Sequence, residues 1–161
     1  MYSHQYKICN TDDLTLQKDW ITITKFMLDK ARFIRVKYWP DDTILSLQNK
    51  DYLATTFGID SLRKYSIRTL KIECNMEEMV CPVNAETKHI ILQINNSQSN
   101  IHNQITSWFH IELLNDIYNI VLYSGDFGHD ILLNILVEEE MKLKELLLKP
   151  ANLTRFKFKS Q

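Results

Sequence analysis

The loop from Gly125 to Asp130 holds the side chains whose types and spacing could do chemistry. It reads GDFGHD, and carboxylates beside an imidazole are groups that transfer protons or bind a metal ion. The same residues also suit a structural role, in which the glycines make turns, Asp126 accepts N–H groups of the turn and Asp130 caps a following helix. We favour the structural role for Asp126, His129 and Asp130, and a small enzyme that uses this loop is an alternative.

The histidines and cysteines elsewhere do not predict a metal site or a nucleophilic thiol. The five histidines lack metal-ligand spacing, and the three cysteines, Cys9, Cys74 and Cys81, form no Cys-x-x-Cys pair. We therefore expect no catalytic residue, no metal and no cofactor. An odd number of widely spaced cysteines is typical of free thiols in a reducing compartment. The polar first residues lack the apolar core of a signal peptide, so we expect a cytoplasmic protein.

Acidic pairs and aromatic residues provide the material for docking on another protein. Complementary charge speeds association and fixes the register of two partners, and aromatic side chains act as anchors. The candidate partner-binding residues are Asp41, Asp42, Trp39, Trp108, Glu77 and Glu78. Their chemistry predicts a basic protein partner, for example a basic toxin domain.

The composition sets the limits for these interpretations. The chain has 161 residues, of which 45% are hydrophobic and 24% are charged, and a formal net charge of −1. These values are typical of a globular chain, which we expect to form one domain over residues 1–161. A near-neutral charge gives no bias toward nucleic acid, and no apolar run is long enough to span a membrane.

The first half of the chain predicts two helices and a strand. Apolar residues three or four apart predict a helix from Asp13 to Lys30 with Thr11 as its cap. Residues Arg32 to Trp39 alternate in polarity and predict a half-buried strand. Residues 49–57 predict a helix that Gly58 ends, with another helical turn after it.

The middle of the chain predicts further strands and includes one open choice. Ser66 to Asn75 and His89 to Asn95 alternate as strands do, and the stretch between them, with Pro82, predicts a loop. Residues 101–123 fit either a helix or a β-hairpin with a turn at Asn115-Asp116. We favour the hairpin, because aromatic and β-branched residues are enriched on both sides of that turn.

The C-terminal part predicts one long helix and an edge strand. Glutamates at 138, 140 and 145 each have a lysine four residues later, which stabilises a helix. We expect this helix to run from Asp130 to Lys149 and to end before Pro150, although the apolar residues 131–137 also fit a buried strand. Arg155 to Lys159 alternates and predicts a final edge strand protected by lysines.

These elements predict an α+β fold with an antiparallel or mixed sheet of about four to six strands, packed by an N-terminal and a long C-terminal helix. Because no group of residues indicates catalysis, we expect a partner-binding protein. A small single-domain chain without a motif is typical of immunity proteins, which neutralise a cognate toxin by occluding its active site. The alternative is a secretion or assembly chaperone, which would bind an extended chain in a groove or along a sheet edge.

Overall fold

The computed structural model describes residues 3–8, 13–40, 53–93, 108–116 and 119–156. They form one eight-stranded sheet in the order β3-β4-β2-β5-β6-β7-β1-β8, and every pair of neighbouring strands is antiparallel. The strands are β1 Ser3–Ile8, β2 Phe33–Tyr38, β3 Arg68–Lys71, β4 Glu77–Pro82, β5 His110–Leu114, β6 Ile120–Gly125, β7 Asp130–Leu136 and β8 Leu153–Phe156.

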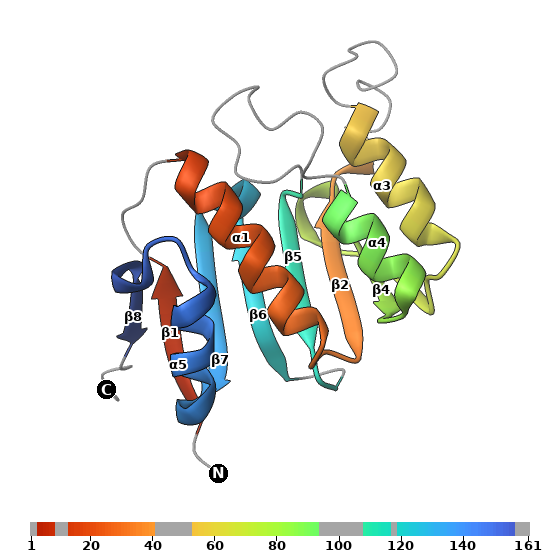
Figure 1. The fold of residues 1–161 in the computed structure, drawn as a ribbon. Coiled ribbons are helices and arrows are strands. Elements are labelled where there is room, and N and C mark those ends of the chain that lie inside the picture. Colours follow the sequence, from red (N-terminus) through yellow and green to blue (C-terminus); the bar gives the residue numbers. More distant parts are fainter. Residues whose placement is uncertain (1–2, 9–12, 41–52, 94–107, 117–118, 157–161) are drawn as a thin grey trace.

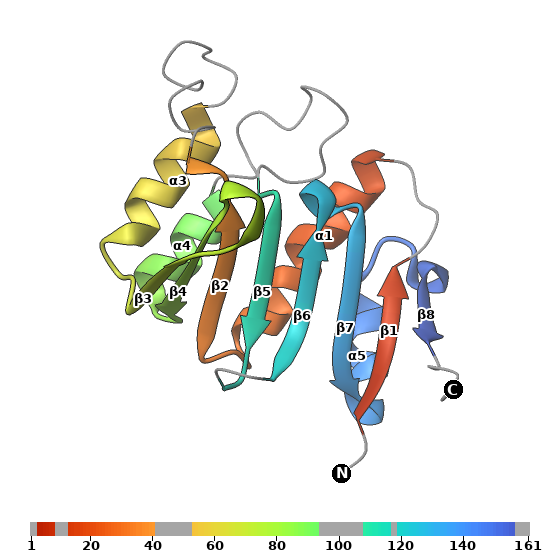
Figure 2. The same cartoon turned by 180° about the vertical axis from the view of Figure 1, so that it is seen from behind.

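Four helices of the described part cover one face of this sheet. They are α1 Asp13–Leu28, α3 Leu53–Arg63, α4 Ala85–Gln93 and α5 Val137–Leu146, and they lie in front of the strands in Figure 1. Seen from behind, in Figure 2, the strands face the viewer and all four helices lie beyond them. We call this second face, which no described helix covers, the open face.

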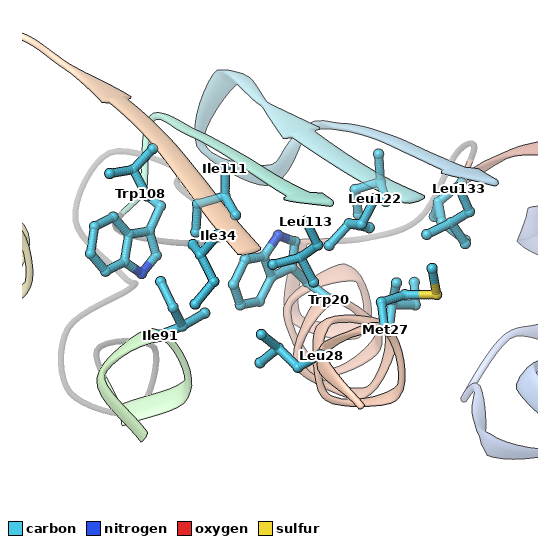
Figure 3. Close-up of a cluster of buried hydrophobic side chains, with 14 of the residues drawn as sticks. Trp20, Met27, Leu28, Ile34, Ile91, Trp108, Ile111, Leu113, Leu122 and Leu133 are labelled. Atoms are coloured by element: carbon cyan, nitrogen blue, oxygen red, sulfur yellow. The ribbon is translucent and has the colours of Figure 1, made fainter. Parts of the chain in front are cut away.

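The hydrophobic core lies between the helices and the sheet. Ile34 on β2, Leu113 on β5 and Leu122 on β6 occupy one row of the register and are buried. They point toward Trp20 and Met27 of α1 (Figure 3). Because side chains alternate between the faces of a strand, the residues one position away from this row point to the open face.

Three predicted elements are confirmed. The predicted N-terminal helix forms as α1, and the predicted strand after it forms as β2, with Ile34, Val36 and Tyr38 buried. The predicted hairpin forms from β5 and β6, which pair antiparallel. Thr11, residues 41–52 and residues 157–161 lie outside the described residues, so the predicted cap, the start of the second helix and the end of the last strand lie there too.

The prediction of four to six strands and a long C-terminal helix is wrong. Asp130–Leu136 is strand β7, between β6 and β1, and α5 is limited to Val137–Leu146. The run looked helical because Leu132, which is 39% exposed on the open face, hides the alternation of the buried residues beside it. Hydrogen bonding to two neighbouring strands outweighs the helical tendency of the leucines.

Asp130 therefore caps no helix. It is the first residue of β7, opposite Gly125, and forms an ion pair of 3.6 Å with Lys7. At the actual start of α5 the carboxylate of Glu139 accepts the Leu136 N–H at 2.9 Å. This contact is one half of a capping box, with the glutamate at the third helical position.

The structure also corrects the middle of the chain. Residues predicted as a loop include β4, whose Met79, Val80 and Cys81 are all buried, so that no alternation marks it. The strand predicted at His89 is helix α4. Asn84 and Thr87 cap that helix reciprocally, each accepting the backbone N–H of the other, at 2.8 and 2.9 Å.

Two smaller boundaries differ as well. Gly58 does not end a helix, because α3 continues through it to Arg63. The long strand predicted over Ser66 to Asn75 is limited to β3, an exposed edge strand. A 3-10 turn follows at Glu73–Asn75, where Cys74 and Asn75 have positive φ. No helix in the described ranges is long and apolar enough to cross a membrane.

Candidate functional site

The centre of the open face is built by one row of the sheet register. Arg68 of β3 lies opposite Val80, Val80 opposite Arg35, Arg35 opposite Glu112, and Glu112 opposite Tyr123. Neighbouring strands lie about 4.8 Å apart, so long side chains in one row reach each other across them. Strand pairing therefore brings together residues from five strands.

Glu112 is the acceptor at the middle of this row. Arg35 Nη1 donates to its Oε2 at 2.7 Å, and Oε1 lies 2.8 Å from His110 Nε2 and 3.3 Å from Lys37 Nζ. The side chain of Glu112 is only 5% exposed. A carboxylate held this deeply needs charged partners and hydrogen bonds; Arg35 and Lys37 supply the charges, and His110 adds a hydrogen bond.

The surroundings of Glu112 determine its ionisation. Burial alone would raise the pKa of its carboxyl, but the hydrogen bond with His110 and the positive charges of Lys37, His110 and Arg35 lower that pKa to about 2. Hydrogen bonds and opposite charges favour the ionised form in this way. Glu112 therefore stays charged and keeps its partners in place at neutral and mildly acidic pH.

Glu78 extends the same network toward the sheet edge. Its Oε1 accepts from Arg68 Nη2 at 2.8 Å and lies 3.7 Å from Arg35 Nε. Arg35 thus joins the two buried carboxylates of Glu78 and Glu112. We call the whole group the open-face cluster; its members are Arg35, Lys37, Arg68, Glu78, His110, Glu112 and Tyr123.

Tyr123 lies beside His110 at one side of the cluster. The two rings meet edge to face, with centroids 5.0 Å apart and an interplanar angle of 88°. A Cβ atom at Gly125, two residues later on the same face, would overlap the Tyr123 hydroxyl. Gly125 has an ordinary φ of −112°, so a glycine is needed there for this close approach and not for a turn.

Tyr123 keeps its proton under ordinary conditions. Burial raises the pKa of the Tyr123 hydroxyl, and the nearby charges of Asp130, Glu112 and Asp126 raise it further. The phenol is thus available to donate a hydrogen bond to a group that approaches the open face.

The aromatic residues predicted for partner binding lie elsewhere. Trp108 is 2% exposed and packs in the core near Ile91 of α4 (Figure 3), so it is no surface anchor. Trp39 is half-buried; its ring lies 4.4 Å from that of Phe109, and its indole N–H donates to the Cys74 carbonyl at 3.2 Å. Asp41 and Asp42 lie outside the described residues.

The predicted acidic pair is split between the two faces of β4. Glu77 is on the helix side, where it accepts the Tyr38 hydroxyl at 2.7 Å and lies 3.9 Å from Arg63. Glu78 is on the open face, paired with Arg68 and Arg35. Both carboxylates are therefore engaged within the chain, and only Glu78 belongs to the cluster.

The Gly125–Asp130 loop joins β6 to β7 through a 3-10 turn. Gly128 has φ of 91°, as predicted for a turn glycine, and the Asp126 carbonyl accepts the His129 N–H at 3.1 Å. His129 is exposed and does not belong to the open-face cluster, whose histidine is His110. Within the described ranges no three histidine, cysteine or acidic residues are grouped to hold a metal ion.

One signal in the sequence points to this site. Glu112 is a charged residue inside the apolar strand His-Ile-Glu-Leu-Leu, and carboxylates are almost never fully buried unless they are paired. Such a residue predicts a buried ion pair with cations on a neighbouring strand. The alternation of residues Arg32 to Trp39 places Arg35 and Lys37 on the polar face of that strand, but the strand order that joins them to Glu112 comes only from the structure.

Comparison with known proteins gives no relative for this arrangement: no family model, curated protein or solved structure matches the chain.

Proposed function

We propose that the protein binds another protein through the open face and performs no catalysis itself. The observation that supports this proposal is the open-face cluster, in which ion pairs hold charged and aromatic side chains on a face that no described helix covers. Arginine and tyrosine are the residue types enriched at binding hot spots. Because the cluster is already ordered, a partner has less side-chain entropy to remove on binding.

Among partner-binding proteins we favour an immunity protein that occludes the active site of a cognate toxin. Such a protein needs a rigid, chemically specific surface and no reaction of its own. Strands carry side chains more rigidly than loops do, and a rigid surface retains its geometry on binding. An immunity protein of this kind would act in the cytoplasm. The odd number of widely spaced cysteines in this chain favours such a reducing compartment.

Co-expression with the product of the neighbouring gene tests this proposal. We expect a folded complex by size-exclusion chromatography and protection of cells from that product. Tyr123→Ala should weaken the complex by at least tenfold, the size of a hot-spot residue. Met141→Ala on α5, which is 70% exposed on the helix side, is the matched control and should leave affinity unchanged. Absence of both a complex and protection would reject the immunity function, and binding only to an unfolded partner would favour a chaperone.

A second candidate, an enzyme with acid–base chemistry, is favoured by the contact between His110 and Glu112. A carboxylate 2.8 Å from one ring nitrogen of a histidine fixes the tautomer of that ring and prepares the other nitrogen for proton transfer. His110→Gln separates the two functions. An enzyme would lose turnover by about a hundredfold or more, whereas a binding protein has no turnover to lose and would change only in its affinity for the partner.

A further inference from the structure

The open-face cluster has a layered arrangement of charge. Its two carboxylates lie deepest, with side chains 5% exposed for Glu112 and 11% for Glu78. Its outermost cations are more accessible, at 25% for Lys37 and 43% for Arg68. A molecule that approaches this part of the sheet therefore meets positively charged nitrogen atoms before it meets a carboxylate.

The cations of the cluster also outnumber its carboxylates. In the described part of the chain, the three cations Arg35, Lys37 and Arg68 pair with the two carboxylates of the cluster, Glu78 and Glu112, before any charge on His110 is counted. Lysine and arginine carry several N–H donors each. One Lys37 donor and one Arg68 donor have a partner in the described structure, so each side chain can also bind a group from outside.

We infer that this cationic part of the open face binds an acidic segment of a partner protein, whose carboxylates contact Lys37 and Arg68 while an adjoining side chain packs on Tyr123. This inference rests on the proposed partner-binding function and specifies the charge of the partner segment that binds. It also reverses the charge of the partner expected from the sequence, because Glu77 and Glu78 already have the cationic partners Arg63 and Arg68 within the chain.

An acidic protein fits this surface better than nucleic acid does. Nucleic-acid binding depends on a row of cations that neutralises several phosphates. Here the cluster has only a small excess of positive charge. The exposed carboxylate of Asp130, two strands from His110, would also repel a phosphate backbone. Leu132, 39% exposed beside Tyr123 in the register, offers apolar contact. Mixed charge with an apolar neighbour is typical of a protein interface.

Fluorescence anisotropy with a labelled glutamate-rich peptide tests the inference. We expect saturable binding to the parent protein that weakens with salt, and about tenfold weaker binding to Arg68→Glu. Lys142 is exposed on α5, on the other face of the sheet from the cluster. Lys142→Glu makes the same change in net charge as Arg68→Glu and should alter affinity by less than about twofold. Lys37→Met provides a second variant of the cluster, and thermal unfolding shows whether each variant is folded.

Three results would overturn the inference. They are preference for a lysine-rich peptide, equal weakening by Arg68→Glu and Lys142→Glu, and tighter binding of a single-stranded oligonucleotide than of the glutamate-rich peptide. Failure of the inference differs from failure of the proposed function. If the cognate partner binds Arg68→Glu as well as the parent but loses affinity for Tyr123→Ala, the inference fails and partner binding stands. If the peptide binds the cluster but no protein partner forms a complex, the proposed function fails.

Discussion

Gly125 and Tyr123 show how a single residue shapes the candidate site. The Tyr123 hydroxyl occupies the space that a Cβ atom at Gly125 would need. Gly125→Ala should therefore push the ring away from His110 and destabilise the protein by about 1–3 kcal/mol, the usual cost of overpacking. Urea denaturation measures the free energy of unfolding, and the ring-current shift of the His110 protons in NMR spectra reports the position of Tyr123.

A double variant separates this effect from a general cost of alanine in the strand. In a Tyr123→Ala background the clash is absent, so Gly125→Ala should cost much less there. An equal cost in both backgrounds would show that the ring does not constrain residue 125. The sequence alone predicts a turn residue at this glycine, because sequence spacing does not reveal where the side chain of a tyrosine two residues earlier will lie.

At the level of single elements, helices and strands were predictable where one face is buried and the other polar. Helix α1 and strand β2 show this pattern, and both predictions are confirmed. Strand β4 is buried on both faces and strand β7 has Leu132 on its open face, so neither alternates in polarity. Short apolar segments of this kind fit a helix or a strand equally well until their neighbours are known.

Helix α5 allows a test of which leucines hold it to the sheet. Leu143 is completely buried, whereas Leu146 on the same helix is 55% exposed. Leu143→Ala should lower the free energy of unfolding by about 2–5 kcal/mol, because it removes buried methyl groups and leaves a cavity. Leu146→Ala is the matched control and should stay within about 0.5 kcal/mol of the parent. Equal costs for the two variants in urea denaturation would contradict the packing of α5.

For the whole molecule, strand order determines which residues meet, and this order is not visible in the sequence. The hairpin of β5 and β6 is local and is predictable from the aromatic and β-branched residues that are enriched in both of its strands. By contrast, β1 lies between β7 and β8, and β2 lies between β4 and β5. Those pairings join residues far apart in the chain. Arg35 reaches Glu112 only through such a pairing, so the residues of the open-face cluster were identifiable singly but not as a group.

The stability of the whole sheet should depend on pH through Glu112. Its pKa is lowered from 4.5 to about 2 in the folded protein. A carboxyl group with a depressed pKa stabilises the fold fully above its unfolded value, and this stabilisation is lost as the pH falls through the folded value. The loss should therefore occur between about pH 4.5 and pH 2, and a shift of this size corresponds to up to about 3 kcal/mol.

Urea denaturation of the parent and Glu112→Gln over this pH range measures the effect. At pH 7 the variant should be less stable by about 3–5 kcal/mol, because the charges of Arg35 and Lys37 lose their buried partner. Below the folded pKa the parent's Glu112 is also neutral, so the difference between the two proteins should decrease toward pH 2. Glu145→Gln, on the exposed surface of α5, controls for the loss of one acidic charge. A difference that stays constant from pH 7 to pH 2 would show that the ionised carboxylate of Glu112 does not hold the five strands of the cluster together.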